Sequence, residues 1–361
     1  MKNKPKSTTL KPLPPQINFE SPACNKLLMD ARVALAELKG YSFGMPNPLI
    51  LLSPAILRES LVSSEIENIH TTMLEVLQNQ LLPETEQKIS DKEVLRYREA
   101  VLWGFKNLGK YPISSRIILG VHKNLILNES GEFRKQQNAI YNPAKKKIVY
   151  MPPTAPEISS LISNWEEFVN ENHLFDPLIK TAMAHYQFEA IHPFGDGNGR
   201  TGRILMVLQL IQDDILRWPI LYISGYINDH RVEYYKLLRN ITKKGDWESF
   251  IIFMLKAYKS QAIETQNVLF NIMKLFEETK EKFKNEHRKI YSADLVEALF
   301  SYPIITPVKL GKELKIHYTT ASRYLYELAS SGVLHEKKVS KYHLFANTEL
   351  LKILVPNKEL K

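Results

Sequence analysis

The sequence predicts an all-α core with a small β-hairpin, followed by a C-terminal winged helix-turn-helix domain. Apolar residues recur at helical spacing through most of residues 25–213, and sustained strand alternation is almost absent there. Residues 291–361 differ, because three short helical patterns precede two short strand patterns around a polar turn. With 361 residues and 44% hydrophobic content, the chain is long enough for two or three compact domains.

The first half of the chain reads as helices separated by turns. Residues 1–20 contain four prolines among lysines and predict an extended N-terminal arm that wraps the body or stays mobile. A helix is expected over 25–39 with Gly40 as its stop, and a proline-rich turn at 45–48 precedes a helical stretch over 49–80 that is broken near 63–68. Further helices are expected over 92–108, 114–127, 155–171, 177–191 and 200–213, with a hairpin over 139–151 that turns at Asn142-Pro143.

The last part of the chain is expected to be a separate module. Its helices are predicted over 293–300, 307–314 and 318–330, and its strands over 332–334 and 342–345. A charged helix over roughly residues 272–289 would connect this module to the core.

Composition restricts the class of protein. The single cysteine, Cys24, cannot form an internal disulfide, and residues 1–16 lack the apolar segment of a signal peptide. No run approaches the roughly 18 apolar residues that a membrane span needs. We therefore expect a cytoplasmic protein without a membrane segment. The net charge of +9 favours polyanionic partners such as nucleotides, nucleic acid or acidic protein surfaces.

The stretch HPFGDGNGR, residues 192–200, is the strongest functional signal. With Thr201, Gly202 and Arg203 added, four of the chain's 14 glycines lie within eight positions. The segment 197–202 fits the dinucleotide fingerprint G-x-G-x-x-G, but a helical pattern precedes it where that fingerprint needs a strand. An EF-hand loop would need an oxygen ligand at the position of Arg200. A plain interhelical turn needs only one or two glycines.

The same stretch has the composition of an anion site. Glycines let backbone N–H groups converge on one point, and the start of the helix near Arg200 adds its positive end there. Arg200 and Arg203 share one face of that helix and suit phosphate oxygens. Asp196 suits Mg²⁺, which prefers carboxylate and phosphate oxygens. His192, at the mouth of the loop, suits a proton acceptor near neutral pH.

These residues resemble the signature of the Fic family, HPFx(D/E)GNGRxxR, at every defined position. Residues 131–134 (GEFR), 150–153 (YMPP) and 185–189 (HYQFE), and the pair Tyr234-Tyr235, agree with the family as well, so the resemblance covers roughly residues 95–255. It implies a helical core and transfer of AMP from Mg·ATP to a Ser, Thr or Tyr hydroxyl of a target protein. Relatives that transfer UMP or phosphocholine leave the donor group open.

The resemblance also implies individual roles. His192 would be the catalytic base, Asp196 the metal ligand, and Phe194 a core residue. The hairpin residues Ile148, Val149 and Tyr150 would form the flap that pairs with an extended target segment. Binding of ATP would involve Gly195, Gly197, Asn198, Gly199, Arg200, Thr201, Gly202, Arg203, Tyr234 and Tyr235. Relatives often carry an asparagine where this chain has Thr242.

A second motif lies at Ser63–Asn68, which resembles the family's inhibitory motif (S/T)xxxE(G/N). By itself it is a helical stretch with two surface acids. In the Fic context, Ser63, Glu67 and Asn68 imply self-inhibition, in which Glu67 pairs with Arg203 and so disturbs the pose of ATP. An alternative is that Glu67 positions a water that removes AMP from a modified target.

The organisation that follows is an arm over 1–20, an N-terminal helical region with the inhibitory helix over 21–90, a Fic core over 91–260, a linker helix over 261–290 and a winged helix over 291–361. The last region carries ten basic and seven acidic residues, a net charge of +3, which is modest for DNA binding. The alternative to DNA binding is that this region docks a protein or forms a homodimer. Besides a transferase and an enzyme that removes AMP, the third possible functional class for the whole protein is a nucleotide-sensing transcription regulator. Contacts to DNA would come from Thr319, Thr320, Ser322, Arg323, Lys337, Lys338 and Lys341.

Overall fold

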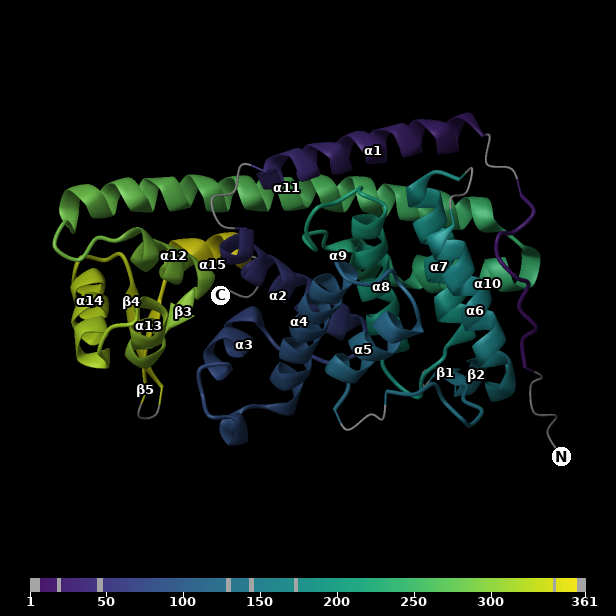
Figure 1. The fold of residues 1–361 in the computed structure, drawn as a ribbon, viewed down its shortest axis with the longest axis horizontal. Coiled ribbons are helices and arrows are strands. Elements are labelled where there is room, and N and C mark those ends of the chain that lie inside the picture. The colour runs from purple at the N-terminus through teal and green to yellow at the C-terminus, as the bar shows by residue number, and fades with distance from the viewer. Residues whose placement is uncertain are drawn as a thin grey trace. The chain divides into compact units, whose positions relative to one another are not determined.

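The computed structural model describes residues 7–17, 21–43, 48–127, 131–142, 146–171, 175–339 and 342–355. Contacts between residues divide the chain into two compact units, which are described separately. The first unit combines residues 1–39 with 96–262, and the second combines residues 40–95 with 263–361. Figure 1 labels the helices and strands of both. No helix of the described ranges is long and apolar enough to cross a lipid bilayer.

The first unit is helical and is built around two buried helices, α7 (Pro177–Ile191) and α8 (Asn198–Gln212). Both are buried around nearly their whole circumference, as helices surrounded by protein are, and they pack directly against each other. Their neighbours include α5 (Ser115–Leu125) beside α8, and α6 (Ile158–Asn170) beside α7, with the short η2 (Ala155–Glu157) before α6. The unit also contains α9 (Ile223–Asp229), α10 (Arg231–Lys244), most of α1 (Pro22–Phe43), and parts of α4 (Ile89–Leu108) and α11 (Trp247–Glu286).

One antiparallel hairpin interrupts the helices of the first unit. Strand β1 (Ile140–Asn142) pairs with β2 (Lys147–Tyr150), with an irregularity after Ile140. This confirms the hairpin expected over 139–151, although residues 143–145 of its turn lie outside the described ranges. We call this hairpin the flap.

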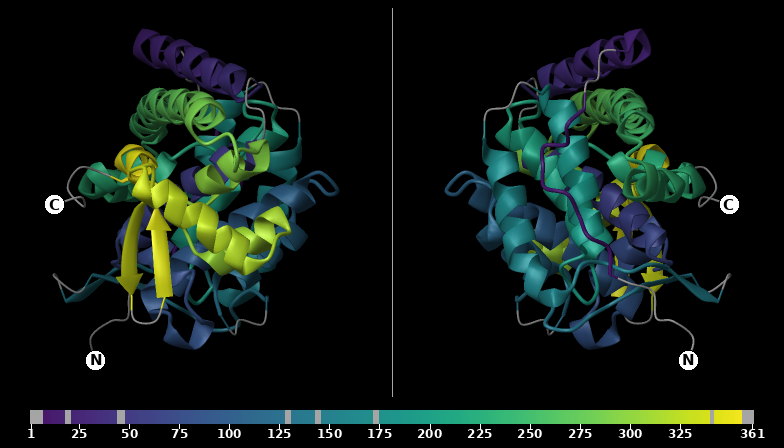
Figure 2. Two further views of the ribbon diagram at one scale, coloured as in Figure 1. Left: turned by 90° about the vertical axis from the view of Figure 1, so that its left-hand side faces the viewer. Right: turned by 90° about the vertical axis from the view of Figure 1, so that its right-hand side faces the viewer.

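The N-terminal arm wraps the body of the first unit, one of the two behaviours expected for it. Residues 7–17 are extended, and the arm runs down the face formed by α6 and α7 towards the flap (Figure 2, right). Leu13 is almost fully buried on that face. The expected arm residues 1–6 and 18–20 lie outside the described ranges.

The second unit joins two distant parts of the sequence in one core. Leu57 of α2 (Pro48–Ile66) and Met73 of α3 (Met73–Asn79) belong to a buried cluster that also contains Ile304 and Leu351. The unit further contains η1 (Glu84–Glu86), α12 (Ala293–Ser301), α13 (Pro307–Leu314), α14 (Tyr318–Ser330) and α15 (Thr348–Leu354). Strands β3 (Ile304–Ile305), β5 (Tyr342–Ala346) and β4 (His335–Val339) form an antiparallel sheet in that order. Helices α12, α13 and α14 followed by the paired strands β4 and β5 have the order of elements that the sequence predicted for a winged helix-turn-helix domain.

Several sequence predictions of elements are wrong in detail. Gly40 does not end α1, which continues to Phe43; a helical glycine costs only about 1 kcal/mol relative to alanine, which packing of the next turn can offset. The strand expected over 332–334 starts at His335 instead, because Gly332 is left-handed with φ 76°. Lys337 and Lys338 therefore lie in β4 and not in the turn. Lys341, like residues 45–47 of the proline-rich turn, lies outside the described ranges.

Candidate active site

The site begins where α7 ends at His192. This residue caps the helix in the left-handed region, with φ 51° and ψ 60°, and its amide donates to the carbonyl of Phe188 at 3.0 Å. Its Nδ1 lies 3.3 Å from the carbonyl oxygen of Glu189. A non-glycine residue in this region costs about 1–3 kcal/mol, and such strain clusters at functional sites. The chain therefore leaves α7 abruptly at the histidine that the sequence marked as the base.

Asn198 closes the loop that follows. Its Oδ1 accepts from the amide of Phe194 at 2.8 Å, and its Nδ2 donates to the Phe194 carbonyl at 2.9 Å. Phe194 is buried, as the resemblance implied, and its ring stacks on His122 of α5 with centroids 3.6 Å apart. Asn198 thus uses its side chain for loop closure, which leaves only its backbone amide for a ligand.

Asp196 and Gly197 form the turn into α8. Nε2 of His122 lies 3.0 Å from the Asp196 carbonyl oxygen and donates to it, which holds the turn against α5. Gly197 has φ 75°, and a Cβ at this position would stand 2.9 Å from Ile126. Glycine is required here both by the backbone angle and by the close approach of a neighbour.

The start of α8 offers an anion site. The first amides of a helix, here those of Asn198, Gly199 and Arg200, have no acceptor within the helix and point towards its N-terminal end, whereas the Thr201 amide donates to the Gly197 carbonyl at 2.9 Å. The guanidinium groups of Arg200 and Arg203 are both buried within the same helix. The first two turns of α8 therefore carry two positive charges that are shielded from bulk water.

Asp196 is the residue of the loop whose carboxylate the sequence predicts to bind a metal ion. Its side chain is 74% exposed, its Oδ1 accepts from the Gly197 amide at 2.6 Å, and its Oδ2 lies 3.3 Å from Nη2 of Arg200. The described ranges contain no cluster of three or more His, Cys, Asp or Glu side chains suited to a metal ion. One exposed carboxylate beside an anion site fits Mg²⁺, which binds through one or two carboxylates and completes its shell with phosphate oxygens and water.

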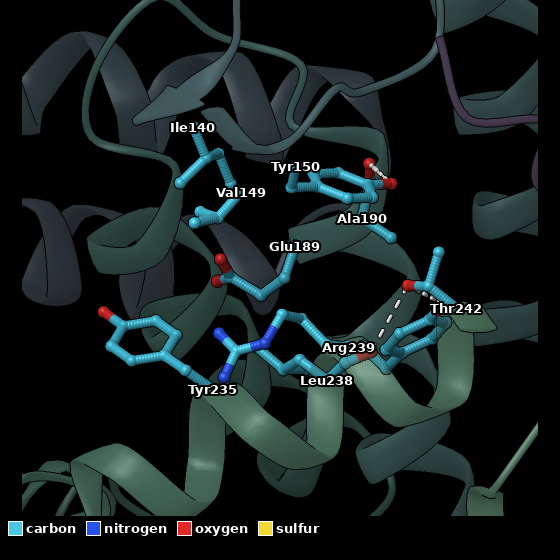
Figure 3. A pocket seen from close by; sticks show the side chains of 10 residues that line it. Ile140, Val149, Tyr150, Glu189, Ala190, Tyr235, Leu238, Arg239 and Thr242 are labelled. Atoms are coloured by element: carbon cyan, nitrogen blue, oxygen red, sulfur yellow. Dashed lines mark hydrogen bonds between the residues drawn. The ribbon is translucent and has the colours of Figure 1, made fainter. Parts of the chain in front are cut away.

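A pocket lies beside this loop, between the flap, α7 and α10 (Figure 3). It encloses roughly 540 Å³ of empty space, part of it open to solvent, and most of its wall is apolar. This size and lining are typical of small-molecule sites. One lining residue also borders α8, because the Glu189 carboxylate lies against Gly202 and leaves no room for a Cβ there. Its lining residues are Ile140, Val149, Tyr150, Tyr186, Glu189, Ala190, Tyr235, Leu238, Arg239 and Thr242.

The structure separates the predicted nucleotide residues into two groups. Tyr235 lines the pocket, but Tyr234 is buried and its hydroxyl lies 2.7 Å from Nε2 of His185. Thr201 and Gly202 are buried where α8 packs on α7. Burial and the neighbouring charge of Arg203 lower the pKa of His185 to about 3, so this imidazole is neutral.

The remaining predicted residues lie at the rim. Gly195 is exposed, has no positive φ, and has open space where a Cβ would stand. In the flap, Val149 and Tyr150 face the pocket, whereas Ile148 is exposed. The Thr242 hydroxyl donates to the Leu238 carbonyl at 3.3 Å and lies 2.9 Å from the Tyr186 hydroxyl, so its hydrogen bonds are largely used within the protein.

Sequence reasoning missed Arg134 as a structural link. Its Nε donates to the His192 carbonyl at 2.9 Å, and its Nη2 donates to the Pro153 carbonyl at 2.6 Å. Its amide also donates to the Pro193 carbonyl at 2.8 Å. The guanidinium therefore joins the loop to the segment after the flap, a role that the pattern GEFR alone does not reveal.

In the second unit, the segment Ser63–Asn68, which resembles the inhibitory motif, ends helix α2. Asn68 is left-handed with φ 64°, its amide donates to the Glu65 carbonyl at 2.9 Å, and the Ile69 amide donates to the Ser64 carbonyl at 3.1 Å. This is a Schellman ending, in which Gly or Asn is favoured at the left-handed position. It explains the last position of the motif and fixes Glu67 at the helix end, while Ser63 is buried in the helix.

Three family models match successive segments of the chain. They describe the Fic/DOC family N-terminal region over residues 25–106, the Fic/DOC family over 112–210, and the C-terminal domain of SoFic-like protein adenylyltransferase over 275–350.

Similar proteins carry related names. "Protein adenylyltransferase Fic" of Aedes aegypti is 33% identical over 148 residues, which are 39% of this chain and 27% of that protein. The protein of the same name from Drosophila melanogaster is 30% identical over 151 residues, 40% of this chain and 28% of that one. The chain thus aligns with less than a third of the length of these relatives.

Solved structures share the fold. A Fic family protein from Desulfovibrio desulfuricans superposes with a TM-score of 0.58 at 19% identity, covering 93% of this chain and 98% of that one. A Fic domain containing signaling protein from Bacteroides thetaiotaomicron gives a TM-score of 0.53 at 15% identity, covering 68% and 95%. With the signature loop, the flap and three family models along one sequence, the chain belongs to the Fic/DOC family.

Proposed function

We propose that this protein is an adenylyltransferase that transfers AMP from Mg·ATP to a Ser, Thr or Tyr hydroxyl of a target protein. The observation that carries the proposal is one continuous arrangement. His192 ends α7, the first amides of α8 begin six residues later, and the flap pocket lies alongside. The names of the aligned relatives support the same activity.

The pocket suits the nucleoside and the loop suits the phosphates. A flat base would lie between Val149 of the flap and Leu238 of α10, both apolar, while Tyr235 borders the same space. The triphosphate would extend towards the α8 amides, Arg200 and Arg203. Bound magnesium would supply charge neutralisation of the phosphates beside Asp196.

The transfer itself needs little covalent work from the protein. The target hydroxyl oxygen attacks the α-phosphorus, its proton passes to the imidazole of His192, and the bond between the α-phosphorus and the bridging oxygen breaks. Pyrophosphate leaves, and the target carries AMP on its oxygen. Positioned amides and guanidinium groups stabilise the charge that develops, which is the main contribution in such reactions.

Labelled nucleotide tests the proposal. Incubation with a lysate is expected to label protein from α-³²P ATP but not from γ-³²P ATP, and His192→Ala abolishes the label. His230→Ala is the matched control, because that histidine is exposed at the end of α9 and is not among the residues that line the pocket. Label from γ-³²P ATP would indicate a kinase, and transfer from UTP or a choline donor would change the donor group.

The pocket assignment has its own test. Leu238→Trp would fill the space for the base and is expected to raise the KM for ATP at least ten-fold. Val232→Trp on the same helix is the control, since Val232 is 85% exposed. Equal KM values for the two variants would place the nucleoside elsewhere.

We further propose that Glu67 inhibits the activity by pairing with Arg203, which the outermost phosphate would otherwise occupy. The fixed end of α2 at Asn68 supports the proposal, because it holds the carboxylate in one place. Glu67→Gly is expected to raise self-labelling, while Glu65→Gly is not. If Glu67 instead positioned a hydrolytic water, Glu67→Gly would abolish the release of AMP from modified protein.

The C-terminal domain is proposed to dock a protein partner or a second copy of the chain. Its net charge of +3 supports this reading over DNA binding. A duplex DNA complex that weakens steeply with salt, and that ATP modulates, would favour a transcription regulator instead.

A further inference from the structure

The N-terminal arm is fastened to both helices on which it lies. Leu13 and Asn164 of α6 form a reciprocal pair, in which the Leu13 amide donates to Oδ1 at 2.8 Å and Nδ2 donates to the Leu13 carbonyl at 3.0 Å. The Lys11 carbonyl accepts from Nε2 of Gln187 on α7 at 2.9 Å. Gln187 is almost fully buried, so loss of the arm would leave its amide without this acceptor.

Beyond these anchors, the arm reaches the flap. The Thr8 amide donates to the carbonyl of Met151 at 2.9 Å, and Met151 directly follows β2. The Thr8 side chain also hydrogen-bonds the hydroxyl of Tyr150. The same hydroxyl donates to the Ala190 carbonyl at 2.8 Å, two residues before His192. Thr8 thus holds the last residues of the flap strand with both its backbone and its side chain.

The flap needs such support. Its strands contain three and four residues, and an isolated two-stranded hairpin is marginally stable in water. Its position over the pocket depends on bonds made at the end of β2. Val149 and Tyr150 form that part of the pocket wall, so any movement of β2 changes the space available to a ligand.

We propose that residues 8–13 act as a strap that fixes the flap over the pocket, with Thr8 as the positioning residue. The hydrogen bonds to Asn164 of α6 and Gln187 of α7 hold the strap in place on these helices, and Thr8 connects the strap to the end of β2. Nucleotide affinity then depends on the arm although none of the arm residues that the structure describes lines the pocket. Only the nucleotide part of this inference rests on the proposed function.

Hydrogen exchange of the ligand-free protein tests the strap without reference to activity. Thr8→Pro removes the amide donor in a segment that is already extended, and is expected to speed exchange of the amides of residues 148–151 about five-fold, the effect of one lost hydrogen bond. Thr9→Pro is the matched control, because Thr9 is exposed and no hydrogen bond of its amide is found among the described residues. Exchange in residues 204–212 of α8 serves as the internal reference. Unchanged flap exchange in Thr8→Pro would overturn the strap.

Nucleotide kinetics then test its consequence. Thr8→Pro is expected to raise the KM for ATP about five-fold with kcat unchanged. Thr8→Val, which keeps the amide donor but loses the hydroxyl, is expected to raise the KM less, and Thr8→Ser, which keeps both, is expected to have the KM of the parent protein. Faster amide exchange in the flap together with an unchanged KM for ATP would overturn the link between the arm and nucleotide affinity. If the parent protein bound no nucleotide, the proposed function would fail, while the exchange experiment would still decide the strap.

Discussion

Replacing Gly197 with alanine tests why the loop before α8 requires glycine. The residue has φ 75°, and an added Cβ would stand 2.9 Å from both Cδ1 and Cγ1 of Ile126. The left-handed conformation costs an L-residue roughly 1–2 kcal/mol, and overpacking costs about 1–3 kcal/mol. Gly197→Ala is therefore expected to lower the free energy of unfolding of the first unit by about 2–5 kcal/mol.

Two other glycines separate these contributions. Gly245 has φ 68° with open space around a Cβ, so Gly245→Ala should cost only the conformational part, about 1–2 kcal/mol. Gly195 has neither constraint, and Gly195→Ala should change stability by less than about 0.5 kcal/mol.

Urea titration followed by tryptophan fluorescence measures all three variants. The four tryptophans all belong to the first unit, so their fluorescence reports its unfolding and not that of the second. A Gly197→Ala protein no less stable than Gly245→Ala would show that contact with Ile126 imposes no constraint, and the reasoning would be refuted.

Other expectations concern pH, the link to the flap and the metal. Since the buried His185 keeps a pKa near 3 while the unfolded chain takes up a proton near pH 6.5, the free energy of unfolding should fall by up to about 1.4 kcal/mol per pH unit below roughly pH 6. His185→Gln should flatten this slope in the same urea titrations. Arg134→Met should lower stability by roughly 2–4 kcal/mol through the loss of its three charged hydrogen bonds, one of them exposed, and a loss under about 0.5 would contradict that role. Asp196→Asn should leave stability within about 0.5 kcal/mol, since the side chain is exposed, yet abolish magnesium-dependent labelling from α-³²P ATP.

Local signals made parts of the fold predictable from sequence. Both bounds of α7 were predicted, because Asp176 caps its start by accepting from the Leu178 amide at 2.8 Å, Pro177 occupies the first turn, and Pro193 follows its end. The break between α2 and α3 was predicted from 63–68 for a similar reason. By contrast, α9 and α10 were missed, and most of the charged helix predicted over 272–289 proved to be the end of the 40-residue α11, which stops at Glu286. Neither α9 nor α10 has a side-chain cap hydrogen bond at its start, so the sequence gives little local sign of where these two helices begin.

The same distinction applies to the site. The loop 192–203 is contiguous, so its spacing alone revealed an anion site. The pocket combines the flap with faces of α7 and α10 that are far apart in sequence, and no local pattern connects them. Once α10 is known to be a helix, its share of the pocket wall does follow from the sequence, because Tyr235, Leu238, Arg239 and Thr242 have the i, i+3, i+4, i+7 spacing of one helix face. Tyr234, one position away, necessarily points elsewhere.

Some residues of the loop fix the conformation of its backbone, and others supply the functional groups for the proposed reaction. Phe194, Gly197 and the side chain of Asn198 fix the backbone through packing, a left-handed turn and two hydrogen bonds. His192 and Asp196 are more accessible, and changing their functional groups leaves those supports intact. Substitutions in the first set should therefore act mainly through the free energy of unfolding, and those in the second mainly through the rate of transfer. A loop that must satisfy both requirements within nine residues has little freedom at any position, which is the physical reason why so short a signature identifies the family.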